Sequence, residues 1–161
     1  MFILSAERDA DSGGEVWSRY EQYLEQNRGR FPESAYQLAT SSWYFDFHDP
    51  RCPHDAWLEE ASIIESGLGE RQESRSVAIK LRLLGAYHNG AIELYYPRVF
   101  RYALSSSATD VGHNDWRYDE FRVADDGHLI HEIEWWGRGE VARWVIEASD
   151  VQFSRHPHVG K

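Results

Sequence analysis

The chain has 161 residues, of which 42% are apolar and 27% charged, enough to bury a core in one domain without disulfides or a structural metal. Its formal net charge is −10, from 27 acidic residues against 17 Lys and Arg. A field of that sign repels phosphate, which argues against direct DNA or RNA binding and favours a basic protein partner. We therefore expect a single domain, residues 1–161, that binds no nucleic acid.

Cysteine content and hydropathy indicate the compartment. The single cysteine, Cys52, cannot form an internal disulfide, which is typical of a reducing cytoplasm. Only Phe2, Ile3 and Leu4 are apolar before charged residues begin, fewer than a signal peptide needs. Because no other apolar run approaches the length of a membrane span, a cytoplasmic location without membrane contact is predicted.

The helical part is expected at about residues 14–41. Val16, Tyr20 and Leu24 recur at helical spacing, and Pro32 suits the first turn of a second helix. Apolar positions at 35, 38 and 39 extend this second helix to about Thr40. The pattern predicts a helical hairpin.

Strand patterns fill the β-rich part, about residues 43–154. WYFDF at 43–47 is a candidate strand, HDPRCP is a loop, and 55–66 fits a helix or a strand, of which we favour the strand. In 77–96, two strand-like runs flank Asn89-Gly90, which predicts a two-residue turn with Leu83 opposite Tyr96. Together the elements predict an α+β fold, with the helical hairpin packed on a mostly antiparallel sheet of about five to seven strands.

The stretch HNDWRYDEFRVADDGHLIHEIEWW, residues 113–136, allows two hairpin registers. A two-residue Asp-Gly turn places Phe121 opposite Glu132. A three-residue loop with Gly127 in the left-handed conformation places the apolar residues of both strands on one face, which favours it. His128 and His131 then point to opposite faces and cannot bind one metal ion, and HLIHE lacks the helix that a metalloprotease signature needs.

The opposite face of this hairpin and of the next strand combines acidic with aromatic and aliphatic residues. It is not the polar face of a sheet exposed to water, so we expect something to cover it: the helices, a second copy, or a partner. The predicted binding residues are Tyr118, Glu120, Glu132, Glu134 and Trp136, with His113, Asp115 and Trp116 from the loop before them. The loop residues fit either ligand binding or local turn chemistry.

One pattern would suit catalysis. Glu120, Glu132 and Glu134 on one face, with Trp136 to stack on a sugar, fit two-carboxylate glycoside chemistry. Arg122 and Arg143 are placed to neutralise these acids instead. The chain has no nucleophile elbow and no glycine-rich phosphate loop. His48, Cys52 and His54 fall short of a zinc ligand set, and the histidines at 156 and 158 are expected in a frayed tail. No metal, cofactor or catalytic residue is therefore predicted.

Several segments resemble a group of small, uncharacterised bacterial proteins: LRLLGAYHNGAIELYYP, GHNDWRYDEF, IHEIEWW and EASDVQF, within roughly residues 55–153. The resemblance implies one compact α+β unit and carries no activity. In size, acidity and aromatic content the chain is also similar to immunity proteins that neutralise bacterial toxins. The leading hypothesis is a non-catalytic, acidic protein-binding module, an immunity-like inhibitor among them. The alternatives are a small-molecule or sugar-processing protein using Glu120, Glu132, Glu134 and His113, and a homodimer.

Overall fold

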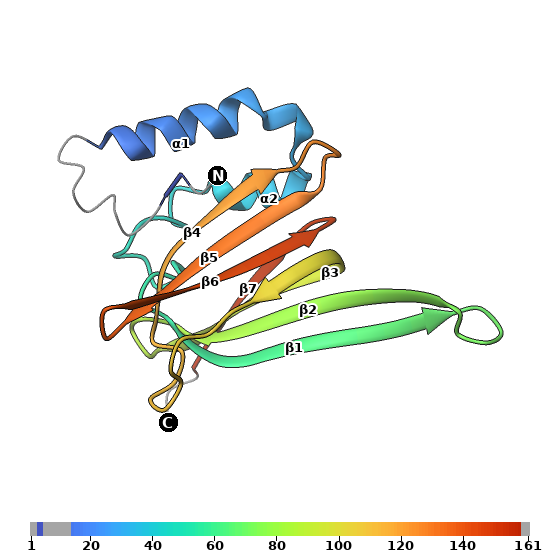
Figure 1. Cartoon of the computed structure of the whole chain (residues 1–161). Helices are drawn as coiled ribbons and strands as arrows, with labels where there is room; N and C mark the ends of the chain where they lie inside the picture. The colour runs from blue at the N-terminus through green and yellow to red at the C-terminus, as the bar shows by residue number, and fades with distance from the viewer. Residues whose placement is uncertain (1–2, 5–13, 159–161) are drawn as a thin grey trace.

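A computed structural model describes residues 3–4 and 14–158, which form two short helices followed by an antiparallel sheet (Figure 1). Phe2 and the charged residues at 7–9, used above in the signal-peptide argument, lie outside the described residues. The α+β prediction is confirmed. The elements are α1 (Glu15–Gln26), η2 (Arg28–Arg30), α2 (Glu33–Ala39), β1 (Trp57–Leu68), β2 (Ser74–Leu84), β3 (Gly90–Leu104), β4 (Asp115–Val123), β5 (Leu129–Gly137), β6 (Glu140–Ala148) and β7 (Gln152–Pro157).

The sheet is curved, so that strand β1 at one end comes into contact with strand β4 at the other. Strand order is β2-β1-β4-β5-β6-β3-β7, and β2 also pairs with β3, so the pairings form a ring. The ring closes through one residue pair, Trp57 with Asp115, between β1 and β4. The inward side chains of the curved sheet form the core together with apolar residues of both helices.

Helix α1 covers the open edge of β4 (Figure 1). The Tyr20 hydroxyl donates to the Phe121 carbonyl at 3.0 Å and accepts from the Phe121 N–H at 2.7 Å, while the Tyr23 hydroxyl accepts from the Val123 N–H at 3.0 Å. These tyrosines satisfy backbone groups that an exposed edge would offer to another strand. The helical hairpin was predicted correctly, and its tyrosines fix it to the sheet.

The β4–β5 hairpin has the predicted three-residue loop. Val123 pairs with Leu129 and Phe121 with His131, and Gly127 is left-handed at φ 85°. Leu129, Ile133 and Trp135 consequently lie buried on the core face. Burial of the apolar set on one face accounts for this register.

The two-residue turn predicted at Asn89-Gly90 is wrong. Leu83 pairs with Ile92, not Tyr96, because the loop spans residues 86–89 and His88 takes the positive φ of 54°. The Gly85 N–H donates to the Gly90 carbonyl, and the His88 N–H to the Gly85 carbonyl. The shift is even, so the inward face is still the predicted one, whereas Tyr87 is exposed in the loop.

Two further expectations are corrected. Residues 43–47 form turns and not a strand: Tyr44 is buried against Phe121, and Phe45 contacts Trp17, so the aromatic run closes the core as the chain leaves α2. The C-terminal residues up to Pro157 are not frayed, because β7 pairs with β3. The preference for a strand over 55–66 is confirmed by β1.

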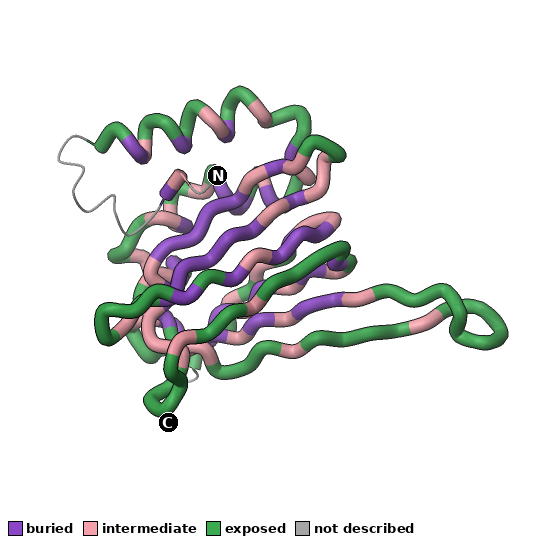
Figure 2. Tube along the Cα trace, in the orientation of Figure 1, coloured by how far each residue is buried: buried purple, intermediate pink, exposed green. Residues whose placement is uncertain are grey.

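Strands β1 and β2 extend beyond the body of the sheet as a long hairpin, which we call the arm (residues 57–84; Figure 2). No residue of β1 is buried, and burial in β2 begins only at Ala78. Within the described residues, no helix combines the length and the apolar character that crossing a membrane requires.

Candidate functional site

The predicted binding residues of the sheet face are mostly buried. Tyr118, Glu120, Glu132 and Glu134 are all buried, and of these five residues only Trp136, 41% exposed, is open to solvent. Tyr118 pairs with Glu134 and Glu120 with Glu132, so these four residues share a face, and a bulge between Trp116 and Tyr118 places Trp116 opposite Trp135 instead. The structure therefore brings these residues together as predicted, on one face of the sheet.

Two arginines neutralise the carboxylates of this face, as the sequence indicated. Arg122 pairs with Glu120 and, at 2.6 Å, with Glu132, while Arg143 lies 3.3 Å from Glu134 and 3.7 Å from Glu132. Glu120 Oε2 also accepts the N–H groups of Ile3 and Leu4, each at 2.6 Å. Burial raises the pKa of Glu120 although these donors oppose the shift. Carboxylates paired in this way present little free charge to a partner.

The loop residues lie elsewhere. The His113 ring contacts Trp135 and Trp144, whose side chains point to the face opposite Glu134 and Arg143. Asp115 accepts the Trp57 indole N–H at 2.8 Å at the ring closure. Trp116 is fully buried in the core. The structure therefore does not bring His113 to the carboxylates with which the glycoside alternative combined it.

His131 is a buried core residue with its hydrogen bonds satisfied. Its Nε2 lies 2.8 Å from Asp119 Oδ2, and its Nδ1 lies 2.6 Å from the Tyr96 hydroxyl. His128, on the other face, stacks on Phe100 and contacts Glu147 at 3.0 Å. The predicted separation of the two histidines is confirmed.

One group of metal-ligand atoms occurs among the described residues. His128, Asp126 and Glu147 each offer one donor, and these lie within 4.8 Å of one another. A zinc site usually has a fourth ligand or an open catalytic position. Here Glu147 is also held by Arg101 at 2.8 Å, so the group is accounted for as an ion-pair cluster. Cys52 is no nucleophile, because burial raises its pKa to about 12.

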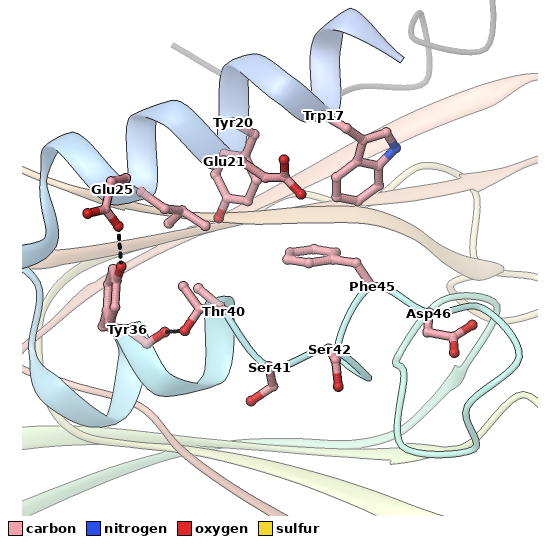
Figure 3. A pocket seen from close by; sticks show the side chains of 12 residues that line it. Trp17, Tyr20, Glu21, Glu25, Tyr36, Thr40, Ser41, Ser42, Phe45 and Asp46 are labelled. Atoms are coloured by element: carbon pink, nitrogen blue, oxygen red, sulfur yellow. Dashed lines mark hydrogen bonds between the residues drawn. The ribbon is translucent and has the colours of Figure 1, made fainter. Parts of the chain in front are cut away.

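A groove of about 540 Å³ lies between α1 and the segment that runs from α2 to Asp46 (Figure 3). We call it the helical groove. Trp17, Tyr20 and Leu24 line the α1 side, and Phe45 packs edge-on to Trp17 with ring centroids 5.0 Å apart. The remaining lining residues are Glu21, Glu25, Tyr36, Ala39, Thr40, Ser41, Ser42 and Asp46.

The helical groove combines aromatic surface with exposed carboxylates, of which Asp46 contacts the His48 ring at 3.4 Å. Glu21, Glu25 and Asp46 are exposed, and the lining contains no Lys, Arg or His. Glu25 accepts a hydrogen bond from the Tyr36 hydroxyl at 3.3 Å, which joins the two walls (Figure 3). Arg28 lies over the Tyr36 ring without being part of the lining. Aromatic faces beside carboxylates attract a cationic group through cation–π and charge interactions.

Sequence reasoning missed this groove. The sequence placed Tyr20 on the packing face of a helix, and Phe45 in the candidate strand 43–47. The available signal was the i, i+4 pair Glu21 and Glu25 beside that apolar stripe. A groove between helices depends on where the segment after α2 turns, which no local pattern specifies.

Searches with this chain against protein-family models, curated proteins and solved structures gave no match. The site must therefore be interpreted from its own geometry.

Proposed function

We propose that the chain is a non-catalytic, acidic protein-binding module whose helical groove receives a basic segment of its partner. One observation carries the proposal: three exposed carboxylates border an aromatic groove that has no basic residue in its lining. The carboxylates of the sheet face, by contrast, are already paired with Arg122 and Arg143.

The partner is expected to present Arg or Lys side chains on an extended or helical segment. The guanidinium or ammonium group would approach Glu21 and Glu25, and the aliphatic stem would pack on Trp17 and Phe45. The net charge of −10 would steer such a partner toward the chain and raise the association rate. An immunity-like inhibitor of a cationic toxin is the biological setting that we propose for it.

The sheet face has a secondary role in this proposal. Trp136 is the exposed aromatic residue among the predicted binding residues, and the Arg117 guanidinium lies 5.9 Å from its ring centroid. The buried residues Glu132 and Glu134, which lie on the same face as Trp136, would have a structural role through their ion pairs with Arg122 and Arg143.

The test is calorimetric titration of the chain with a hexa-arginine peptide at low salt. Glu21→Gln/Glu25→Gln should weaken binding about tenfold, which equals about 1.4 kcal/mol. The matched control Glu15→Gln/Glu33→Gln removes the same charge from exposed positions outside the groove and should change the affinity less than about twofold, because solvent screens distant charges. Equal losses in both variants would show that only net charge matters and would refute the groove.

A further inference from the structure

The outer edge of β1 is open over most of its length. β1 pairs with β2 along Trp57–Leu68, but on its other side it pairs with β4 only at Trp57. From Leu58 onward, no described residue pairs with that edge. A long strand with unpaired N–H and C=O groups is a template for another strand.

This edge carries exposed apolar side chains on both faces. Ile63 and Ile64 point to opposite faces of the arm and are 49% and 46% exposed, and Leu68 near the tip is 76% exposed. The edge strand also carries three glutamates, and each has a basic partner on β2: Glu59 with Arg82, Glu60 with Lys80, and Glu65 with Arg75. The three glutamates of β1 are therefore paired within the arm.

Charge separates the arm from the rest of the chain. Residues 57–84 contain five acidic residues (59, 60, 65, 70, 73) and four basic residues (71, 75, 80, 82), a net charge of −1 against −10 for the whole chain. Two copies of an acidic protein repel each other least where the local charge is near zero. The arm is such a region, and it is also where the open edge lies.

We infer that the β1 edge pairs with the β1 edge of a second copy of this chain, antiparallel and centred on Ile63. This register places Ile63 opposite its own symmetry mate, Ala61 opposite Glu65, and Glu60 opposite Ser66. No glutamate then faces a glutamate across the twofold axis, whereas a shift by one residue places Glu60 opposite Glu65. Like charges directly opposite each other destabilise a strand pair.

A groove beside the edge accommodates the tip of the second arm. It measures about 440 Å³. Its apolar and aromatic lining comes from Leu58, Ala61, Leu104, His113 and Trp144, and its polar lining from Glu59, Glu60, Ser105 and Ser106. When Ser66 of one copy pairs with Glu60 of the other, Leu68 of the first copy lies opposite Leu58 of the second. The most exposed apolar side chain of the arm thus reaches Leu58, which lines this groove of the other copy.

Sedimentation velocity over a range of concentrations tests the inference. The wild type is expected to form dimers, and Ile63→Lys to be monomeric, because it places two ammonium groups directly opposite each other. Ser76→Lys adds the same charge to β2 of the same arm and should leave the dimer intact. Ile63 is half exposed, so the variant should keep its fold, which circular dichroism will verify. A wild type that stays monomeric, or an Ile63→Lys variant that still forms dimers, would overturn the inference.

Oxidative cross-linking gives a second readout that also defines the register. Ile63→Cys should form an intermolecular disulfide, because the Cα atoms of directly opposite residues lie about 4.5–5.5 Å apart, within the range that disulfides span. Leu68→Cys should not, since ten residue steps, or about 33 Å, would separate the two sulfurs. Cross-linking through position 68 without cross-linking through position 63 would overturn the pairing proposed here.

Discussion

The Nε2 atom of His131 lies 2.8 Å from Oδ2 of Asp119, with both side chains buried inside the curved sheet. The same carboxylate accepts the Tyr44 hydroxyl at 2.7 Å and the Trp116 indole N–H at 2.9 Å. Burial and the neighbouring Asp119 charge raise the pKa of Tyr44 well above its ordinary value, so the hydroxyl remains a donor. This buried carboxylate joins the turn after α2 to strands β4 and β5.

Asp119→Asn should destabilise the fold by about 2–3 kcal/mol, because the amide nitrogen meets donors and leaves at least one unsatisfied in the core. Urea unfolding monitored by tryptophan fluorescence measures the difference. The control Asp125→Asn, exposed in the β4–β5 loop, should change stability by less than about 0.5 kcal/mol. Equal stabilities for the two variants would mean that the buried carboxylate contributes nothing.

Tyr20→Phe should cost about 1–3 kcal/mol, because it leaves the Phe121 N–H and C=O without the hydroxyl that satisfies both. Thermal unfolding by circular dichroism measures the loss, and Tyr102→Phe, at an exposed position, is the control. An unchanged melting temperature for Tyr20→Phe would argue that α1 is not needed to cover the β4 edge.

The buried carboxyl of Glu120 predicts a pH dependence. Burial raises its pKa, so the folded chain holds this proton more strongly than the unfolded chain does. Its contribution to stability is therefore full below the ordinary carboxyl pKa and is lost as pH rises through the raised value. The stability of the wild type relative to Glu120→Gln should fall from pH 4 toward neutrality, measured by urea unfolding at each pH. A relative stability that increases with pH would contradict this sign.

Cys52 should resist alkylation in the folded chain. Its pKa of about 12, raised by burial, leaves almost no thiolate at pH 8. Iodoacetamide should modify it only after unfolding in urea, as followed by intact mass spectrometry, and because the chain has no other cysteine the assay reports on this site alone. Rapid modification of the native chain would show that the segment after α2 opens readily.

Local patterns predicted much of this molecule because burial selects among local alternatives. The three-residue loop at Gly127 followed from keeping Phe121 and Leu129 on one face, and the two histidines separated as a consequence. The two-residue turn predicted at Asn89-Gly90 is wrong, because turn preference alone does not fix loop length. His88 takes the positive φ in a longer loop, and the same side chains of β2 and β3 still point inward. The strand predicted at 43–47 is wrong, because these aromatic residues form turns from which their rings close the core.

The candidate site, too, could be predicted only in part. Arg122 and Arg143 could be placed on the same face as the glutamates from strand alternation, since that relation is local to the hairpins. The helical groove could not be predicted, because Trp17 and Phe45 meet only through the path of the chain after α2. The open β1 edge likewise depends on β4 leaving β1 after a single residue pair.

The most direct test of the proposed function is the NMR signal of the Trp17 indole N–H during titration with hexa-arginine, assigned with Trp17→Phe. Trp17 lines the helical groove beside Glu21, so its signal should shift progressively and saturate, and Glu21→Gln/Glu25→Gln should reduce that shift strongly. The Trp136 signal, on the sheet face, should move less. Saturable binding that shifts Trp136 and leaves Trp17 unchanged would contradict the groove as the binding site.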